Sequence, residues 1–329
     1  MVNEELTTNA DDKKTDKLIT LATPNKQCHV SIMALPLNPE AVKLIESQKH
    51  LLKAFFTGDQ AHLTAESIAA YESFKADLKS LLDQDPHEEL HDCEILAFGP
   101  RKTGPNVLLS KYCGKIDQFS SIENGFQLAT LSGPLCEEPL MGCAFVIQDF
   151  NIDLDMVIEN DLYGPVSGQI VSIVKEGCRK AFQAHPQRLM AAMYSCDVTV
   201  KADVLGKMYA VLNKRHGKIV HENMIEGSSN FVVTAHLPVI ESFNFAAEIR
   251  KQTSGLAMPQ LVFSHWEVID LDPFWIPQTA EEILHFGDKA DSDNFARGYM
   301  NEIRKKKGLA IDEKIVEFAE KQRTLTRMK

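Results

Sequence analysis

The chain has 329 residues, of which 44% are hydrophobic and 25% charged, and its formal net charge is −11. These proportions are those of an ordinary soluble globular protein, and the length suffices for two domains with separate cores. No segment approaches the run of about 18 apolar residues that a membrane span needs, and residues 1–20 lack the apolar stretch of a secretory signal. Composition therefore argues against a membrane-spanning or exported protein.

The seven cysteines are scattered along the chain without a Cys-x-x-Cys pair. Structural zinc needs four close ligands, and a disulfide scaffold needs dense pairing. We therefore expect reduced thiols in a cytoplasmic protein, each buried as a small apolar side chain.

The first half of the chain predicts alternating strands and helices. Residues 1–21 are polar and aperiodic, which predicts a disordered N-terminal segment. A strand is expected at 28–35, and Asn38 followed by Pro39 predicts the start of a helix. Thr64 is a candidate N-cap for a second helix, whose apolar stripe recurs at spacings of three and four residues: Ile68, Tyr71, Phe74, Leu78 and Leu81.

Two extended pieces flank a turn-rich motif, FGPRKTGPNVLL, at residues 98–109. A helix is predicted at 117–131 and a strand at 141–148. The next helix ends before Pro186, and one face of it is apolar: Ile170, Val174, Cys178 and Ala181. A domain boundary is expected near His185 and Pro186.

From Leu189 onward the hydrophobic pattern is clearer. Apolar residues alternate from Tyr194 to Val200, which predicts a half-buried strand, and Asp203 is a candidate N-cap for the helix that follows. The predicted elements after that helix are a strand at 218–224, a strand at 231–237, a helix at 239–252 and a strand at 261–269. The order β-α-β-β-α-β predicts a ferredoxin-like sandwich.

Two or three helices are predicted after Pro273, separated by Gly287 and Gly308. The fold class is therefore α+β: an α/β part, a ferredoxin-like β-α-β-β-α-β domain and a C-terminal helical tail. From Arg297 to Lys329 there are ten Lys and Arg against five Asp and Glu, although the chain as a whole is acidic. A basic tail on an acidic body predicts local contact with RNA, while the body meets protein or is repelled by nucleic acid.

The string His87-Glu88-Glu89-Leu90-His91 matches HExxH, in which two histidines one helical turn apart bind zinc and the glutamate activates water. The motif needs a surrounding helix and a third ligand. Pro86 precedes the first histidine, and a strand-like segment begins two residues after the second. A zinc-dependent hydrolase that uses His87, Glu88 and His91 is therefore the alternative, and a solvated surface turn is the favoured interpretation.

Nucleotide-binding motifs are absent from the sequence. None of the Gly-Lys pairs, at 114–115, 206–207 and 217–218, is followed by Ser or Thr, so no phosphate-binding loop is formed. Gly-x-Ser-x-Gly is also missing. We expect no catalytic residue, no cofactor and no GTP hydrolysis by this chain alone.

Three stretches of sequence resemble the elongation factor two and elongation factor G family. Residues 209–269 resemble domain V of that family, and residues 98–109 and 125–150 resemble domain IV. The tail at 272–325 is similar to that of the elongation factor-like GTPases of cytoplasmic 60S maturation. After the N-terminal segment 1–21, the resemblance implies a domain IV-like part at 22–188, a domain V-like part at 189–271 and a helical extension at 272–329.

The resemblance also implies a role. Family members bind the 60S ribosomal subunit with the Shwachman–Diamond syndrome protein, and they use GTP and Mg²⁺ to release initiation factor six. The chain would then be the ribosome-docking C-terminal part of such a protein, without membrane association, either as a short form or as an incomplete gene product.

Candidate contact residues fall into two sets. For ribosomal RNA we expect basic side chains to pair with phosphates: Lys214, Arg215, Lys218, Arg304, Lys305, Lys306 and Lys307. The domain IV tip carries no histidine, whereas elongation factor two has a modified one there, which disfavours a role in translocation. The same tip holds four acids that phosphates would repel, so we expect it to meet protein: Asp153, Asp155, Glu159 and Asp161.

Overall fold

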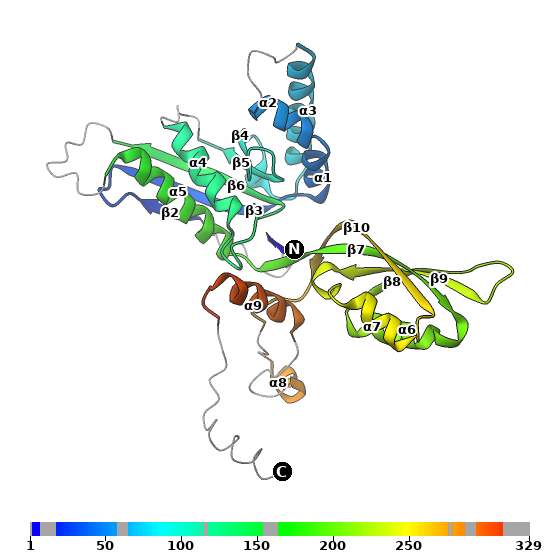
Figure 1. The fold of residues 1–329 in the computed structure, drawn as a ribbon. Helices are drawn as coiled ribbons and strands as arrows, with labels where there is room; N and C mark the ends of the chain where they lie inside the picture. Colours follow the sequence, from blue (N-terminus) through cyan, green and yellow to red (C-terminus); the bar gives the residue numbers. More distant parts are fainter. Residues whose placement is uncertain are drawn as a thin grey trace, which may run out of the picture.

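The computed structural model describes residues 2–6, 18–57, 65–112, 114, 118–153, 164–275, 277, 279–286 and 294–311. Figure 1 shows two sheets side by side, each with its own helices, and a further helix beside the junction between them. The fold is α+β, as the sequence predicts. We call the part built on the first sheet the arm and the part built on the second sheet the ferredoxin-like domain.

The arm is built on a mixed sheet. Its strand order within the described residues is β2-β3-β6-β5-β4, and β5 and β6 are parallel while the other pairs are antiparallel. Parallel neighbours need a crossover connection, which α4 (Phe119–Leu131) supplies. The strands are β2 (Ile19–Ala22), β3 (Cys28–Pro36), β4 (Glu94–Gly99), β5 (Asn106–Ser110) and β6 (Cys143–Ile152).

Helices cover both faces of the arm sheet. Phe145 and Ile147 of β6 face α4 and α5 (Val166–Gln183), whereas Ala144 and Val146 face the other core. This alternation follows from the two-residue period of a strand. The second core is closed by α1 (Pro39–Ser47), α2 (Lys49–Thr57) and α3 (Ala65–Asp83).

The N-terminus of α1 confirms one local prediction, because the Asn38 side chain accepts a hydrogen bond from the Glu40 amide at 3.0 Å. The predicted cap at Thr64 lies outside the described residues. Asp203 does not cap the helix after β7: it lies in a short 3-10 turn, and Val204 occupies the N-cap position without a side-chain bond.

The ferredoxin-like domain has the strand order β10-β7-β9-β8, with all neighbouring strands antiparallel. This is the arrangement that the β-α-β-β-α-β pattern predicts. Cys196, Val198 and Val200 of β7 face the two helices. The elements are β7 (Gln187–Lys201), α6 (Leu205–Lys214), β8 (Lys218–Met224), β9 (Asn230–Pro238), α7 (Phe245–Gln252) and β10 (Ala257–Ile269).

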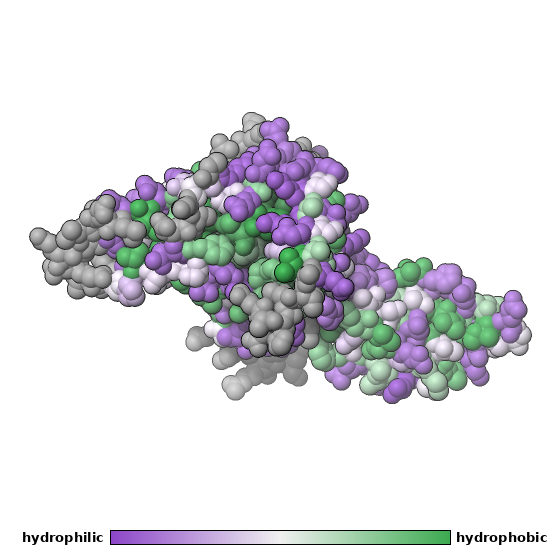
Figure 2. Space-filling model, turned by 90° about the horizontal axis from the view of Figure 1, so that it is seen from above, coloured by the Kyte–Doolittle hydropathy of each residue, from purple (hydrophilic) through white to green (hydrophobic). Residues whose placement is uncertain are grey.

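One face of this sheet has no helix over it among the described residues. Figure 1 shows α6 and α7 beneath the sheet, so the view from above in Figure 2 looks onto the opposite face. Hydrophobic patches are visible there, whereas hydrophilic side chains cover much of the arm in the same view. Met258 and Val262 of β10 are 70% and 66% exposed. They alternate with Ala257 and Leu261, which pack against the helices.

The expectation of disorder over 1–21 is wrong for part of that segment. Strand β1 (Val2–Leu6) pairs with residues 187–191 at the start of β7, and β2 lies at the edge of the arm sheet. The physical reason is an unfilled edge: β9 pairs with β7 only from Met193 onward, so the backbone groups before Met193 need another partner. Polar composition did not reveal this pairing.

A hydrophobic cluster joins the two parts of the molecule. Leu135 and Cys136, which follow α4 in the arm, pack with Tyr299 and Met300 of helix α9 (Phe295–Lys307). Strand β7 contributes Leu189, Ala191 and Met193 to the same cluster. Helix α9 therefore contacts both the arm and the ferredoxin-like domain. The described part of the tail contains two helices, as predicted, with α8 (Ala280–Phe286) preceding α9.

No helix among the described residues is both long and apolar enough to cross a membrane.

Six cysteines in the described part of the chain are buried, and none of them forms a disulfide: Cys28, Cys93, Cys136, Cys143, Cys178 and Cys196. This confirms the expected role for these six, whereas Cys113 lies outside the described residues. Burial raises the pKa of Cys28 to about 11 and that of Cys196 to about 12, and it also raises the pKa of Cys178. The thiolate, which is the reactive form, is therefore scarce at neutral pH.

We predict that Cys28, Cys178 and Cys196 resist iodoacetamide at pH 8 in the folded protein. The raised pKa values keep the thiols protonated, and burial keeps the reagent out. Residue-resolved mass spectrometry measures the modification, with the same reaction in denaturant as the positive control. Alkylation of these three thiols at the rate of a free cysteine would contradict the structure.

Candidate functional site

The predicted RNA-contacting cations divide between two places. Lys214, Arg215 and Lys218 lie at the end of α6 and the start of β8, and the other four lie in the last turn of α9. The surroundings of these cations differ greatly, both between the two places and between neighbouring residues.

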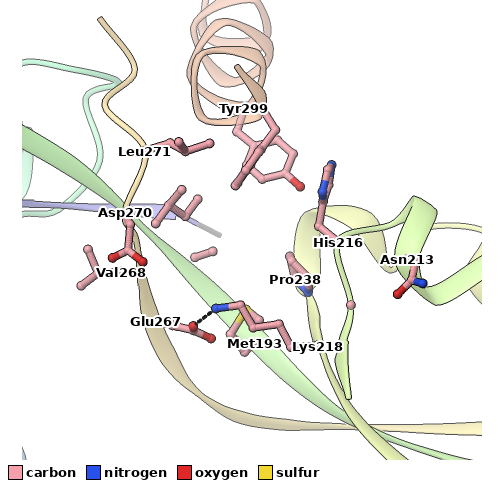
Figure 3. A pocket seen from close by; sticks show the side chains of 14 residues that line it. Met193, Asn213, His216, Lys218, Pro238, Glu267, Val268, Asp270, Leu271 and Tyr299 are labelled. Atoms are coloured by element: carbon pink, nitrogen blue, oxygen red, sulfur yellow. Dashed lines mark hydrogen bonds and ion pairs between the residues drawn. The ribbon is translucent and has the colours of Figure 1, made fainter. Parts of the chain in front are cut away.

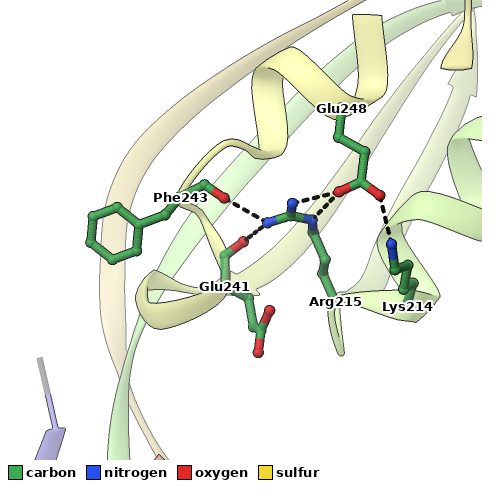
Figure 4. Close-up of polar contacts among 5 residues, drawn as sticks. All are labelled: Lys214, Arg215, Glu241, Phe243 and Glu248. Carbon is green, nitrogen blue, oxygen red and sulfur yellow. Dashed lines mark hydrogen bonds and ion pairs between the residues drawn. The ribbon is translucent and has the colours of Figure 1, made fainter. Parts of the chain in front are cut away.

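Arg215 is held inside the ferredoxin-like domain rather than displayed on it. Its side chain is only 15% exposed, and its Nε and Nη2 atoms donate to the Glu248 carboxylate at 2.8 and 2.5 Å. Its Nη1 atom donates to the carbonyl oxygens of Glu241 and of Phe243, the latter at 2.8 Å (Figure 4). The guanidinium also lies over the Phe245 ring, 5.9 Å from its centroid. Arg215 therefore ties α6 to α7 and to the loop before α7.

Lys214 adjoins the same carboxylate from outside. Its Nζ atom lies 2.9 Å from Oε1 of Glu248, and its side chain is 72% exposed. Hydrogen bonds from Lys214 and Arg215 hold the pKa of Glu248 below its usual value. The bonds of Glu248 to these two cations therefore stabilise the fold at any pH above the unfolded-state pKa of a glutamate. The stabilisation is lost as the pH falls through the lowered pKa of Glu248 in the folded protein. Of the two cations, only Lys214 can turn toward an external phosphate while it breaks a single ion pair, because Arg215 would have to give up bonds to Glu241, Phe243 and Glu248.

Lys218 lies at the rim of a cavity of about 510 Å³ between the ferredoxin-like domain and α9 (Figure 3). Its ammonium pairs with Glu267 of β10. Apolar side chains that include Met193, Pro238 and Leu271 form much of the wall. Asp270 lines the cavity as well. The cavity is thus mostly apolar with a few polar groups, which is the usual make-up of a small-ligand pocket.

One ring contact and one hydrogen bond close the α9 side of this cavity. The His216 ring stacks on Phe295 with 4.7 Å between centroids, and the Tyr299 hydroxyl donates to a Glu241 carboxylate oxygen at 3.0 Å. Burial and then the Glu241 charge raise the pKa of Tyr299. The groups are committed to packing, and we find among the described lining residues no nucleophile activated by a base. The arrangement is that of a joint between elements rather than a reaction centre.

The cations of α9 also serve the joint. Arg304 Nη1 donates to the Leu135 carbonyl oxygen of the arm at 2.9 Å. Lys307 Nζ donates to the Glu137 carbonyl oxygen at 2.7 Å and pairs with the Glu138 carboxylate at 2.6 Å. Both residues thus bind the arm loop that follows α4.

Lys306 and Lys305 face outward from α9. Lys306 pairs with Glu302 one turn earlier at 2.6 Å, with both side chains exposed. Lys305 is exposed and has no ion-pair partner among the described residues. The four predicted cations of α9 are consecutive in the sequence, but their roles differ. Two of them bind the arm, and the other two face solvent.

Of the predicted acidic tip, only Asp153 is among the described residues. It follows β6 and is exposed, with its amide donating to the Gln27 carbonyl oxygen at 2.8 Å. Asp155, Glu159 and Asp161 lie outside the described residues.

The structure gives no support to the zinc alternative. His87 and His91 bracket a single 3-10 turn (Glu88–Leu90), so they do not share one face of an α-helix. A ring nitrogen of His91 is already hydrogen-bonded to the Asp85 carbonyl oxygen at 2.8 Å. The described part of the chain contains no cluster of three His, Cys, Asp or Glu suited to a metal. The reason is local: Pro86 and the strand that starts at Glu94 leave no length for a helix.

Sequence reasoning missed a second cavity, of about 640 Å³, beside the turn between β4 and β5. Its wall includes Lys49, Lys53, Arg101 and Trp266, which come from α2, the turn and β10. The only available signal was the pair of Gly-Pro dipeptides that bracket Arg101 and Lys102 in FGPRKTGPNVLL.

We predict that Arg215→Ala lowers the free energy of unfolding by more than about 1 kcal/mol, because two carbonyl oxygens lose their donor. Lys214→Ala, the matched control next to it, should change that free energy by less than about 0.5 kcal/mol, because its side chain is exposed. Denaturant titration of both variants measures the difference. Equal effects would show that Arg215 is as free as Lys214.

Two family models match the chain. One, described as elongation factor G C-terminus, matches residues 188–275, and the other, described as an elongation factor-like GTPase 1-like domain, matches residues 33–111. The first range covers the ferredoxin-like domain, and the second lies within the arm.

Several curated relatives align along nearly the whole chain. Elongation factor-like GTPase 1 of Homo sapiens is 44% identical to it, over 95% of this chain and 34% of the relative. Ribosome assembly protein 1 of Saccharomyces cerevisiae is 39% identical, over 91% of this chain and 29% of the relative. The protein of the same name in Schizosaccharomyces pombe is 43% identical, over 79% and 28%. The chain thus spans about a third of the length of these relatives.

Proposed function

The chain belongs to the elongation factor-like GTPase family, and from that premise we propose that it is a ribosome-docking part of a protein of large-subunit assembly. The observation that carries the proposal is the 39–44% identity to its relatives, one of which is named ribosome assembly protein 1. The ferredoxin-like fold alone would not suffice, because that fold hosts many functions.

The finer role follows the family resemblance. The chain acts in the cytoplasm on the 60S subunit, together with the Shwachman–Diamond syndrome protein, and contributes to the release of initiation factor six. GTP and Mg²⁺ belong to the GTPase of the family, and this chain hydrolyses no GTP by itself. The lack of a phosphate-binding loop in the sequence supports that division of labour.

The arrangement of charges supports docking by separate surfaces. Lys214, Lys305 and Lys306 are exposed cations of the ferredoxin-like domain and of α9, and they are suited to phosphates of ribosomal RNA. Lys218 contributes through a partly exposed ion pair. The acidic tip of the arm would be repelled by phosphate and meets protein instead.

A joint that holds two domains in a fixed relation also favours docking. A rigid body that meets two distant sites on a particle avoids the extra entropic cost of fixing its domains relative to each other on binding. Arg304 and Lys307 contribute to the function through this joint and not through direct phosphate contact.

We predict that Lys305→Glu together with Lys306→Glu weakens binding to purified large ribosomal subunits. The plot of log affinity against log salt should become shallower by about one unit for each phosphate contact that is lost. Co-sedimentation at several salt concentrations measures both quantities. The Tm should stay within a few degrees, because the two side chains face solvent.

The control variant is Arg304→Ala, which should lower the Tm through its lost bond to the arm. In the same assay, replacing the four tip acids by Asn or Gln should weaken binding to partner proteins and leave the salt dependence unchanged. A salt dependence unaffected by the Lys305 and Lys306 changes would exclude them as RNA contacts. Failure of the chain to bind large subunits, or hydrolysis of GTP by the chain unaided, would contradict the proposed function itself.

A further inference from the structure

The turn between β4 and β5 holds its backbone in a costly conformation. Arg101 and Lys102 have φ angles of 58° and 61°, in the left-handed region that non-glycine residues rarely adopt. Each such residue costs about 1–2 kcal/mol relative to the right-handed region. Conformations of this kind persist where the surroundings fix them, and they gather at sites of function.

The surroundings of this turn do fix it. Asn106 is fully buried, and its side-chain amide donates to the carbonyl oxygens of Gly99 at 3.0 Å and Leu140 at 2.8 Å. Its Oδ1 atom accepts from the Cys143 amide at 3.0 Å. The bonds of Asn106 anchor the two ends of the turn to β6 and to the segment before it.

Lys102 is held as well. Its amide donates to Gln127 Oε1 at 3.1 Å, and its ammonium lies 3.1 Å from the Glu123 carboxylate of α4. A Cβ on Gly99 would approach Thr130 Oγ1 to 2.6 Å, so the turn is also tight sterically. Hydrogen bonds, an ion pair and close packing thus all fix the backbone of this one turn.

Arg101 is the residue that this scaffold leaves available. Its side chain is exposed and makes no hydrogen bond or ion pair with any described residue. Every other polar side chain of the turn that we have named serves the turn itself. The turn is strained and held in place by its neighbours, and it exposes one unpaired guanidinium. These properties are typical of a residue that contacts a binding partner.

Arg101 lines the cavity of about 640 Å³, and positive charges outnumber negative ones in the lining. Lys49 and Lys53 of α2 add two cations to its wall, and Glu46 is the single carboxylate of the lining. Thr103 supplies a hydroxyl. In a chain whose net charge is −11, this hollow is locally positive, and it suits an anion.

Trp266 of β10 indicates which class of anion the cavity suits. It lines the cavity from the ferredoxin-like domain, so the hollow combines cations with the edge or face of an indole ring. Proteins that hold single-stranded nucleic acid combine a positive groove with aromatic rings on which bases stack. An acidic protein segment would use the cations but gain little from the indole.

We propose that the hollow between α2, the β4–β5 turn and Trp266 binds a single-stranded segment of ribosomal RNA, with Arg101 on a phosphate and an unpaired base against Trp266. The inference rests on the proposed ribosome docking and gives it a second RNA contact, separate from α6 and α9. It also assigns a role to the FGPRKTGPNVLL motif: the motif builds the scaffold that presents Arg101.

The main test is Arg101→Gly in the full chain. Glycine adopts a positive φ without strain, so this variant removes the guanidinium while it preserves the turn. The expected Tm is therefore equal to or above that of the parent, whereas affinity for a labelled single-stranded oligouridylate of about 12 nucleotides should fall about fivefold or more at low salt. The slope of log affinity against log salt should shrink by about 0.7, the value for one single-strand phosphate contact.

Two further variants sharpen the result. Trp266→Leu should weaken oligonucleotide binding about fivefold or more without altering the salt slope, because it removes stacking and no charge. Arg250→Gln, at an exposed position of α7, is the charge-loss control and should leave binding unchanged. Glutamine is used there because glycine within a helix costs about 1 kcal/mol. Fluorescence anisotropy measures the affinities, and thermal unfolding measures the Tm.

Co-sedimentation with large ribosomal subunits runs in parallel and separates the two proposals. In one outcome the parent chain binds subunits, and Arg101→Gly and Trp266→Leu change neither that binding nor the oligonucleotide affinity. This outcome overturns the RNA site and leaves the docking function standing. No parent binding to subunits overturns the docking function, and with it the ribosomal identity of the RNA. Displacement of the oligonucleotide by an acidic peptide, combined with no effect of Trp266→Leu, would instead assign the hollow to an acidic protein and overturn the inference.

Discussion

Burial of α9 against both domains is the constraint on which the rest of the molecule depends. Tyr299 and Met300 pack with Leu135 and Cys136 of the arm, and the same cluster includes residues of β7. Arg304 and Lys307 add polar bonds to the arm loop around this apolar contact. Because apolar burial fixes proximity and directional bonds fix orientation, the two domains and α9 form one joint. The surfaces near this joint gain their geometry from it.

Strand β7 is the second element that the domains share. Its first residues pair with β1 and contribute to the joint, while its later residues form the centre of the ferredoxin-like sheet. The two cavities lie where β10 passes this joint: Glu267 lines one of them and Trp266, the preceding residue, lines the other. Neighbouring residues of a strand point to opposite sides, which explains how one strand serves both hollows.

Cations in this protein differ in role according to their bonds and not their position in the sequence. Arg215 and Lys214 are adjacent, yet the side chain of the first is largely enclosed by two carbonyl oxygens and a carboxylate, while that of the second is exposed. Arg101 and Lys102 show the same contrast in the arm, where Lys102 pairs with Glu123. A guanidinium whose donors are satisfied inside the fold is stabilising but costly to withdraw, so it is unsuited to an exchangeable partner.

The sequence by itself determined the order of elements in the ferredoxin-like domain, because the alternation in β7 and β9 and the apolar face of α6 are local patterns. It also determined the Asn38 cap and the lack of a nucleotide-binding motif. It did not reveal the pairing of Val2–Leu6 with β7, the internal bonds of Arg215 or the cavity beside Arg101. Each of these depends on groups far apart in the chain, such as Arg304 and Leu135. Periodicity records which face of an element is apolar, whereas only the packed structure decides which charges find partners and which remain exposed.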